Sequence, residues 1–311
     1  MAKLTAVEFF SGIGAFSYAA KSHDIDVIAA FDQYALANDT FEHNFSLRPH
    51  SKNLDSINID QIPPADIWWM SPPCTPFTVR GKQKGLSDPR SRSFLNLIDY
   101  LPILKPQLVM VENVTAFAES DACEKLLCLA RQCSYSTAAV QLCSTQFGVP
   151  MRRPRHFLVA KRDSNSTNSN SDLDLDKQFS IPSPAIAARK SLTDYLSADS
   201  NELLLDPDVV TRYGGGFDIV TGSGEDNVIC FTKNYARCMK ASGSLLRLDD
   251  GRLRRFSPEE ILRLLGFGNN FSFPEEIQLE ARWRLVGNSV DVRAIDHLLK
   301  FSGETVKPSL A

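Results

Sequence analysis

A cysteine in a stiff, proline-flanked stretch is the first candidate for covalent chemistry in this sequence. Cys74 follows Pro72 and Pro73, just after the apolar run "DIWWM" (66–70). The two prolines fix their φ angles, so the thiol is presented at one place rather than left mobile. A thiol is the best nucleophile among the side chains near neutral pH, provided that a neighbouring group assists it. The alternative, a buried structural cysteine, is the usual fate of a free thiol and stays open on this stretch alone.

A carboxylate and two arginines complete a candidate reaction site. Glu112 lies near the end of the next apolar run, "QLVMVEN" (107–113), where an acid is costly unless it is paired or functional. Arg153 and Arg155 precede a further apolar run, and their permanent charges suit a phosphate or a pyrimidine carbonyl oxygen. Taken alone, Glu112 could be an exposed loop acid and the arginines a solvated charge run.

A glycine turn near the N-terminus predicts a site for a cofactor that carries a nucleoside. "FFSGIGAF" (9–16) opens a helical pattern, and Gly12 and Gly14 let the backbone turn tightly and approach a ligand. Asp32 lies twenty positions after Gly12 at the end of the second apolar run, where an acid can hold ribose hydroxyls. The third glycine of a dinucleotide fingerprint is missing, so no strong pyrophosphate site is predicted. A tight turn with a helix-capping aspartate is the alternative interpretation.

The elements that must position these residues alternate between strand-like and helix-like segments. Nearly continuous apolar runs predict strands that are covered on both faces of a parallel sheet. The predicted strands are residues 4–10, 26–32, 66–70, 107–113 and 156–162. We predict an α/β fold with a doubly wound, mostly parallel sheet, in which adjacent strands place Cys74 and Glu112 beside one crevice.

The character of the chain changes after Arg162. Residues 163–178 are rich in Ser, Asn and Asp, which predicts a disordered linker loop. Residues 179–280 lack the strand–helix rhythm and predict a smaller second domain, to which the resemblance described below assigns target recognition. This domain contains a helix with Ser257 as N-cap, Glu260 three residues later and Gly266 as its stop. The first domain then comprises residues 1–162 and 281–311, with a final helix at about 288–301.

Composition and charge exclude several classes of protein. The chain has 311 residues, of which 43% are hydrophobic and 23% charged, as in ordinary globular proteins. No run of about 18 apolar residues exists, so no membrane association is expected, and the N-terminus reads as a first strand rather than a signal peptide. Seven scattered cysteines without a CxxC pair predict a reduced, cytosolic compartment and no metal site. A net charge of −3 leaves room for local basic patches only.

These motifs, in this order, resemble those of the cytosine carbon-5 methyltransferases. "FFSGIGA", "PPC", "ENV", "RRPR" and "VGNSV" (286–290) are similar to the first cofactor motif, the nucleophile motif, the acid motif, the paired-arginine motif and the last cofactor motif. "CFTKNYARCMKASGSLL" (230–246) resembles the signature of the tRNA subfamily, which was once classed with the DNA enzymes. Two departures are Thr75, where the family usually has Gln, and Met151, where DNA enzymes commonly have Gln. A DNA cytosine methyltransferase and an inactive nucleic-acid-binding protein are the alternatives.

The resemblance implies a class I methyltransferase that uses S-adenosylmethionine and methylates carbon-5 of the anticodon-loop cytosine at tRNA position 38. Cys74 would add to carbon-6, Glu112 would contact or protonate ring N3, and Arg155, supported by Arg153, would hold the carbonyl oxygen. Aspartate tRNA is the expected substrate and glutamate tRNA a variant of it. We expect a monomer in the cytoplasm, or also in the nucleus if the source is eukaryotic.

The resemblance also implies two sets of binding residues. The implied cofactor contacts are Phe10, Ser11, Gly12, Ile13, Gly14, Asp32, Asp55, Ser56, Pro72, Asn288, Ser289 and Val290. The implied RNA contacts are Arg80, Lys82, Lys84, Arg90, Arg92, Cys230, Phe231, Thr232, Lys233 and Tyr235. The cations of the first group can grip backbone phosphates beside the nucleophile, and a second basic patch is predicted at Arg247, Arg252, Arg254 and Arg255.

Overall fold

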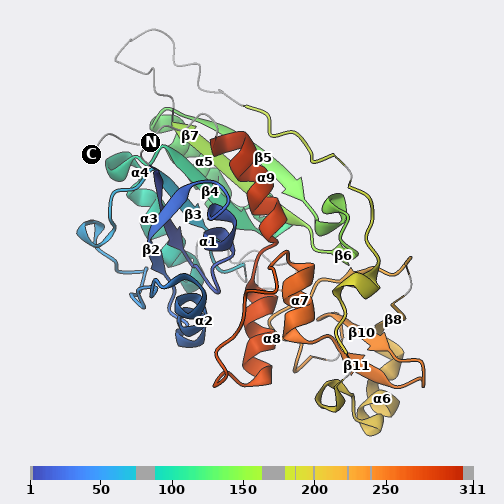
Figure 1. Cartoon of the computed structure of the whole chain (residues 1–311). Helices are drawn as coiled ribbons and strands as arrows, with labels where there is room; N and C mark the ends of the chain where they lie inside the picture. The colour runs from blue at the N-terminus through green and yellow to red at the C-terminus, as the bar shows by residue number, and fades with distance from the viewer. Residues whose placement is uncertain are drawn as a thin grey trace.

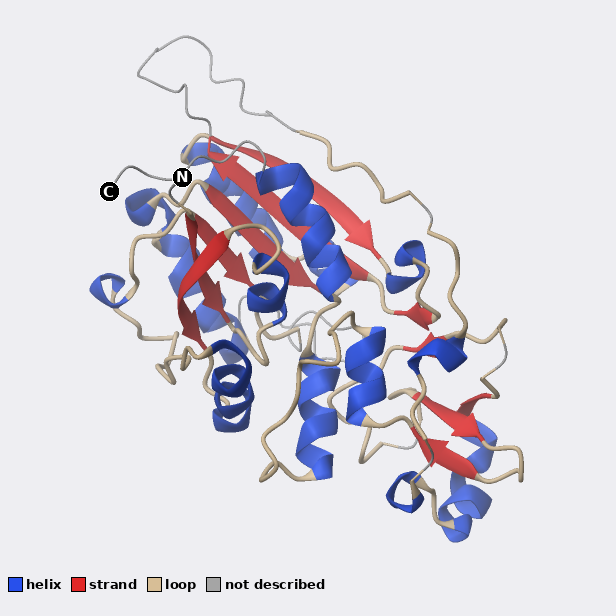
Figure 2. Cartoon of the chain, in the orientation of Figure 1, coloured by secondary structure: helices blue, strands red, loops and turns tan. Residues whose placement is uncertain are grey.

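A six-stranded sheet with helices on both faces forms the larger part of the protein (Figures 1 and 2). The structure is a computed structural model that describes residues 3–74, 88–162, 179–185, 187–198, 200–222, 224–238 and 240–303. The strand order is β2-β1-β3-β4-β7-β5. The first four strands are parallel, whereas β7 runs antiparallel to both of its neighbours. The predicted α/β fold with a doubly wound, mostly parallel sheet is therefore confirmed.

The sheet strands follow the apolar runs of the sequence. They are β1 (Leu4–Phe9), β2 (Ile25–Phe31), β3 (Ile67–Met70), β4 (Leu108–Asn113), β5 (Tyr135–Leu142) and β7 (Arg155–Arg162). Trp68 and Trp69 show why these runs are continuous, because one packs into the core on each face of the sheet. The five predicted strands agree with β1, β2, β3, β4 and β7 to within one residue at each end. The prediction missed β5, because only three of the eight positions of this edge strand are buried and they do not follow the period of two that marks a strand.

Two layers of helices cover the sheet. α1 (Ala15–Ala20) and α9 (Val292–Gly303) pack on one face, and α3 (Arg92–Asp99), α4 (Leu101–Leu104) and α5 (Asp121–Gln132) pack on the other. α9 begins four residues after the predicted start at 288, since the Asp291 carboxylate accepts the Arg293 N–H and starts a new helix there. In the described part of the chain, no helix is both long and apolar enough to cross a membrane.

A second group of elements lies beyond one edge of the sheet, at the lower right of Figure 1. Its members are β6 (Met151–Arg152), α6 (Pro207–Tyr213), β8 (Asp218–Val220), β9 (Val228–Ile229), β10 (Ser244–Arg247), β11 (Leu253–Arg255), α7 (Pro258–Leu264) and α8 (Leu279–Asn288). The remaining helix of the larger part is α2 (Ala35–Phe45). One hydrophobic cluster continues from Met110 in the sheet to Phe231 and Phe256 in this second group. The two groups therefore share a core, and the domain boundaries given above stay a prediction. The predicted loop 163–178 lies outside the described residues.

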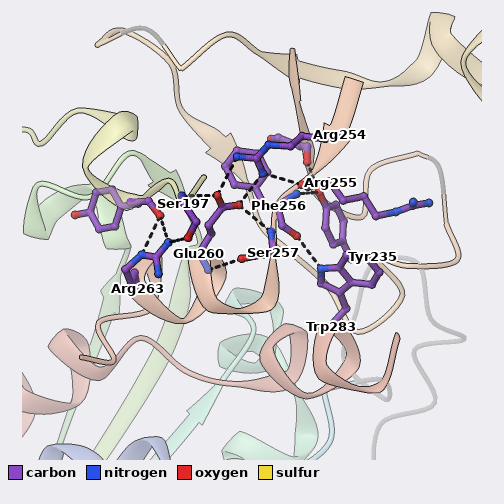
Figure 3. A network of polar contacts seen from close by, with 11 residues as sticks. Ser197, Tyr235, Arg254, Arg255, Phe256, Ser257, Glu260, Arg263 and Trp283 are labelled. Atoms are coloured by element: carbon purple, nitrogen blue, oxygen red, sulfur yellow. Dashed lines mark hydrogen bonds and ion pairs between the residues drawn. The ribbon is translucent and has the colours of Figure 1, made fainter. Parts of the chain in front are cut away.

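A buried ion pair organises the second group (Figure 3). Glu260, which is fully buried, accepts two hydrogen bonds of 2.9 Å from the guanidinium of Arg254. It also accepts the backbone N–H groups of Ser257 and Ser197, each at 2.8 Å. The predicted cap of this helix by Ser257 is confirmed. The prediction of Arg254 as part of a surface patch is wrong, because its side chain points inward from β11 to meet this carboxylate.

Removing the charge of Glu260 should destabilise the protein. In the variant Glu260→Gln, the buried guanidinium of Arg254 loses its counter-charge, which should lower the free energy of unfolding by about 3 kcal/mol or more. Urea unfolding followed by circular dichroism measures this change. The neighbouring variant Glu259→Gln is the control, because that side chain is 45% exposed and its loss should cost no more than about 0.5 kcal/mol. Equal stabilities of the two variants would contradict the role given to the ion pair.

Candidate active site

The carboxyl ends of the parallel strands meet at one edge of the sheet, where a cavity of about 350 Å³ lies. Gly12 after β1, Asp32 after β2, Cys74 after β3 and Glu112 in β4 all line this cavity. Arg155 lines it as well, because the antiparallel strand β7 starts at the edge where the parallel strands end. The topology thus brings a thiol, a carboxyl group and a guanidinium to the cavity that also contains the glycine turn.

Glu112 and Arg155 form an ion pair in the wall of this cavity. The Arg155 Nε lies 3.1 Å from the Glu112 Oε1, and their side chains are only 16% and 9% exposed. Burial raises the pKa of Glu112 in spite of the attraction of Arg155 and Arg153. The carboxyl group therefore holds a proton more readily than an ordinary glutamate, so it can donate a hydrogen bond to a ligand.

The loop that carries Cys74 is tied to the strands on either side of β3. The Ser71 hydroxyl donates to the carbonyl of Phe10 at 3.1 Å, and the Asn113 amide donates to the carbonyl of Pro72 at 3.0 Å. The thiol of Cys74 itself is exposed. A rigid loop that presents an accessible sulfur is suited to nucleophilic chemistry.

The guanidinium of Arg153 mainly contacts other groups of the protein, whereas the sequence suggested a contact with the substrate. Its guanidinium is buried and donates to the carbonyls of Phe231 (2.8 Å), Gly287 (3.2 Å) and Ser289. It also lies 3.0 Å from the sulfur of Cys230. Arg153 is part of the cavity lining and joins three segments of the chain there, but most of its donors are committed to the protein rather than to a ligand.

The glycine turn forms the other side of the cavity. Gly12 and Gly14 have φ angles of +53° and +87°, and a Cβ at Gly14 would lie 2.4 Å from the ring of Phe45. At Gly12, by contrast, no atom of the described residues lies within 4 Å of such a Cβ. The Asp32 carboxylate accepts the N–H groups of Gly12 and Tyr34, each at 2.8 Å, so it fixes the turn and faces the cavity.

The remaining polar groups fit a cofactor with a nucleoside. Ser289 and Asn288 line the cavity opposite the turn. The Ser289 hydroxyl is buried and has no hydrogen-bond partner among the described residues. Burial raises the pKa of Asp32, although the backbone N–H groups of Tyr34 and Gly12 oppose this shift. An unused hydroxyl and a carboxyl group contributed by residues of one cavity lining can hold the hydroxyls of a sugar.

Several predicted cofactor residues lie outside the cavity lining. The side chains of Ile13 and Val290 are buried in the hydrophobic core, so only their backbone could reach a ligand. The carboxylate of Asp55 accepts the hydroxyl of Ser93, and it is Ser93 that lines the cavity. The others outside the lining are Ser11, Gly14 and Ser56, whereas Phe10 and Pro72 are part of it.

The predicted RNA contacts have four different outcomes. Phe231 and Tyr235 are buried, and the Tyr235 hydroxyl donates to the carbonyl of Ser244 at 2.6 Å, so their rings serve the core and cannot stack on a base. Lys233 lines the cavity. Thr232, Arg92 and Cys230 are not part of the cavity lining. The sulfur of Cys230 contacts Arg153, which is part of it. Arg80, Lys82 and Lys84, together with Thr75, fall outside the described residues.

Two predicted cations are paired with acids. Arg90 binds Asp88 through two hydrogen bonds of 2.8 and 2.6 Å, and Arg252 lies 2.6 Å from Asp250. In the second predicted basic patch, Arg247 is exposed and Arg255 lies over the ring of Trp283. The patch is therefore less basic than the sequence suggests.

Sequence reasoning missed several residues that line the cavity. These are Gln33, Tyr34, Ala37, Leu54, Ser71, Pro73, Ser93, Asn113, Val114, Leu285 and Gly287. Most of them lie within two positions of a predicted residue, so adjacency to a motif was the signal that could have found them. Within the described residues, no group of three or more His, Cys, Asp or Glu side chains could hold a metal ion.

Three comparisons bear on this site. A family model described as C-5 cytosine-specific DNA methylase matches residues 4–215 and 218–302. A tRNA (cytosine(38)-C(5))-methyltransferase of Schizosaccharomyces pombe is 29% identical, over 96% of this chain and 96% of that protein. A DNA (cytosine-5)-methyltransferase of Dictyostelium discoideum is 30% identical, over 96% and 94%. The solved structure of an Entamoeba histolytica methyltransferase has a TM-score of 0.87 at 27% identity, and the match covers 99% of this chain and all of that one.

The buried acid Glu8 connects strand β1 to helix α1, which directly follows the glycine turn. Glu8 in β1 is 1% exposed, and it accepts hydrogen bonds from the backbone N–H and the hydroxyl of Ser17 in α1. Burial raises the pKa of Glu8 to about 8, although the hydrogen bonds from Ser17 oppose the shift. Glu8 is therefore protonated at neutral pH in the folded protein and ionised in the unfolded chain.

This raised pKa predicts a loss of stability with rising pH. The contribution of protonated Glu8 is complete below its unfolded pKa of 4.5 and is lost as the pH rises to about 8. The loss should be on the order of 4 kcal/mol. The variant Glu8→Gln, which keeps a neutral acceptor, should lack this dependence in urea unfolding measured across that range. Asp26→Asn, at an exposed position of β2, is the control and should follow the wild type. Parallel curves for the wild type and Glu8→Gln would show that Glu8 is not the group responsible.

Proposed function

Since this chain belongs to the family of C-5 cytosine-specific DNA methylases, we propose that it methylates carbon-5 of a cytosine in tRNA. The observation that carries the proposal is the meeting of Cys74, Glu112 and Arg155 at one cavity beside the glycine turn. The methyl donor of the proposal is S-adenosylmethionine, which supplies the methyl group when bound.

Three residues of the cavity have separate roles in this reaction. The Cys74 sulfur forms a bond to carbon-6 of the cytosine, which moves electron density toward carbon-5 and ring N3. Protonated Glu112 meets ring N3 and stabilises that density, while Arg155 holds the carbonyl oxygen. After methylation, a base takes the carbon-5 proton and the bond to Cys74 breaks. A cytosine in a single-stranded loop reaches such a pocket at low cost, because it has few stacking contacts to lose.

The opposite wall would hold the cofactor. Asp32 would bind the ribose hydroxyls, the backbone at Phe10 and Gly12 would lie against the methionine part, and Asn288 and Ser289 would close the site. The open space at Gly12 and the unused hydroxyl of Ser289 support this arrangement. We place the enzyme in the cytoplasm as a monomer, and its seven free cysteines are consistent with a reducing compartment.

Two observations favour RNA over DNA in this proposal. The relative from S. pombe is named for cytosine 38 of tRNA, and the turn 230–233 at the cavity belongs to the segment that resembles the tRNA subfamily. We therefore propose position 38 of aspartate tRNA, with glutamate tRNA as a second substrate. The relative from D. discoideum is named for DNA at a similar identity, which makes duplex DNA the second candidate.

Labelled cofactor tests the choice of substrate. The protein should transfer label to tRNA but not to duplex DNA, and bisulfite sequencing should find the new mark at position 38. Cys74→Ala should lower turnover at least about a thousandfold and leave tRNA binding in place, since the thiol acts in the covalent step. Cys128→Ala removes another exposed thiol, on α5, and should keep full activity. Label in DNA alone would overturn the RNA assignment, and full activity of Cys74→Ala would remove Cys74 from the mechanism.

The cofactor site has its own test. The variant Asp32→Asn loses a charged acceptor for the ribose hydroxyls, so the dissociation constant for S-adenosylmethionine should rise about tenfold or more in calorimetry. Asp55→Asn is the matched control and should change affinity less, because that carboxylate is bonded to Ser93. A larger effect of Asp55→Asn than of Asp32→Asn would reverse the roles of the two acids.

A further inference from the structure

Two guanidinium groups and one carboxyl group of the cavity lining form a compact cluster with the sulfur of Cys230. The Cys230 Sγ lies 3.0 Å from the Arg153 Nη1 and 3.7 Å from the Arg155 Nη2. The Arg155 Nε lies 3.1 Å from the Glu112 Oε1. Arg155 is thus placed between an acid and a sulfur, and Arg153 contacts the same sulfur from its other side.

The proposed reaction creates a problem of charge in this cluster. Glu112 must hold a proton opposite ring N3, and in that state it is neutral. Arg153 has carbonyl partners, but carbonyls carry no net charge. Asp291, which also attracts Arg153, is bonded to Arg293 at 3.0 Å. Protonation of Glu112 would then leave two buried cations with little compensation, which is costly.

We propose that Cys230 is a thiolate that supplies the missing counter-charge, so that Glu112 can keep its proton beside two arginines. In this role Cys230 is a positioning residue: it sets the protonation state of Glu112 through Arg155 and does not touch the substrate. The inference rests on the proposed methylation of cytosine but not on the choice between RNA and DNA.

The pKa shifts in the cluster agree with this distribution of charge. Burial by itself would raise the pKa of the Cys230 thiol, but the attraction of Arg153 and Arg155 outweighs it and lowers the pKa. Burial raises the pKa of Glu112 although both arginines oppose the shift. Relative to an ordinary cysteine and an ordinary glutamate, the surroundings thus favour negative charge on the sulfur and a proton on the carboxyl group.

A neutral thiol is the competing interpretation. The Cys230 sulfur lies 3.5 Å from the carbonyl of Phe231, which a thiol could use as an acceptor. Two further titratable groups from other elements face the cluster. Cys74 attracts Arg155 when it carries a negative charge, and Lys233 is part of the cavity lining. Cys74 is removed in the titration described next, so that its own ionisation does not obscure that of Cys230.

Ultraviolet thiolate absorbance tests the charge of the sulfur without any nucleic acid. The spectra of Cys74→Ala and of the double variant Cys74→Ala/Cys230→Ser are compared from about pH 6 to about pH 9. The difference between them should show one thiolate already present well below the ordinary cysteine pKa of about 8.5. A difference that appears only near or above that pH would overturn the proposal. Because no substrate is present, this result is independent of whether the protein methylates tRNA.

Single-turnover rates test the effect on Glu112. In Cys230→Ser, Arg155 is left to attract Glu112 alone, so the pKa of Glu112 should fall. The rate at neutral pH should then drop about tenfold or more, and the alkaline limb of the pH–rate profile should move to lower pH. Cys230→Asp restores a negative charge and should recover much of the rate and the position of the limb. Cys238→Ser, at an exposed position nearby in the sequence, should behave as the wild type.

The same profiles separate this role from a purely structural one. If Cys230 served only packing, Cys230→Ser would lower the rate equally at every pH, and Cys230→Asp would be no better than Cys230→Ser. Either result would overturn the proposal. Unfolding curves of each variant identify a loss of the folded state, in which case the absorbance titration decides.

Discussion

The buried guanidinium of Arg153 is the contact on which the geometry of the site depends. Its donors reach the carbonyls of Phe231, Gly287 and Ser289, so it fixes the turn 230–233 against the end of α8. The two backbones approach so closely that a Cβ at Gly287 would lie 2.3 Å from the carbonyl carbon of Thr232. Only a planar, permanently charged group with several donors can bridge carbonyls from separate segments in this way, which a lysine could not do. The segment 230–233 and the end of α8, which carry parts of the proposed base and cofactor sites, are thus held together by one side chain.

Burial then decides which groups around this contact carry charge. Inside the protein an unpaired charge is expensive, so each acid near the cavity either finds donors or keeps its proton. Burial raises the pKa of both Asp32 and Glu112, but Asp32 accepts two backbone N–H groups that oppose the shift, whereas Glu112 is opposed by the charges of Arg155 and Arg153. The two carboxyl groups can therefore serve opposite purposes at one site, one as an acceptor for a sugar and one as a proton donor to a base. Their environments, and not their residue types, make the distinction.

The sequence was most informative where a function depends on the ends of strands. Cys74 and Glu112 follow two apolar runs with one crossover between them, and neighbouring parallel strands bring such ends together. It was least informative about burial in the second group of elements, where Arg254, Phe231 and Tyr235 look like surface or binding residues but are buried. Periodicity cannot show that an arginine meets Glu260 six residues away, or that Arg153 binds carbonyls that are 78 to 136 residues distant. Those contacts depend on tertiary packing alone.

The continuous core has a consequence for how the site works. Trp283 of α8 donates to the carbonyl of Phe256 at 2.7 Å, so the helix that ends in the cofactor wall is anchored to the network around Glu260 (Figure 3). The segment 230–235 joins the same network, because the hydroxyl of Tyr235 at its end accepts the N–H of Phe256. In the proposed reaction, the groups that would meet the base and those that would meet the cofactor therefore belong to one packed unit. Binding energy need not be spent on assembling them, which leaves more of it for extruding the base and for the transition state.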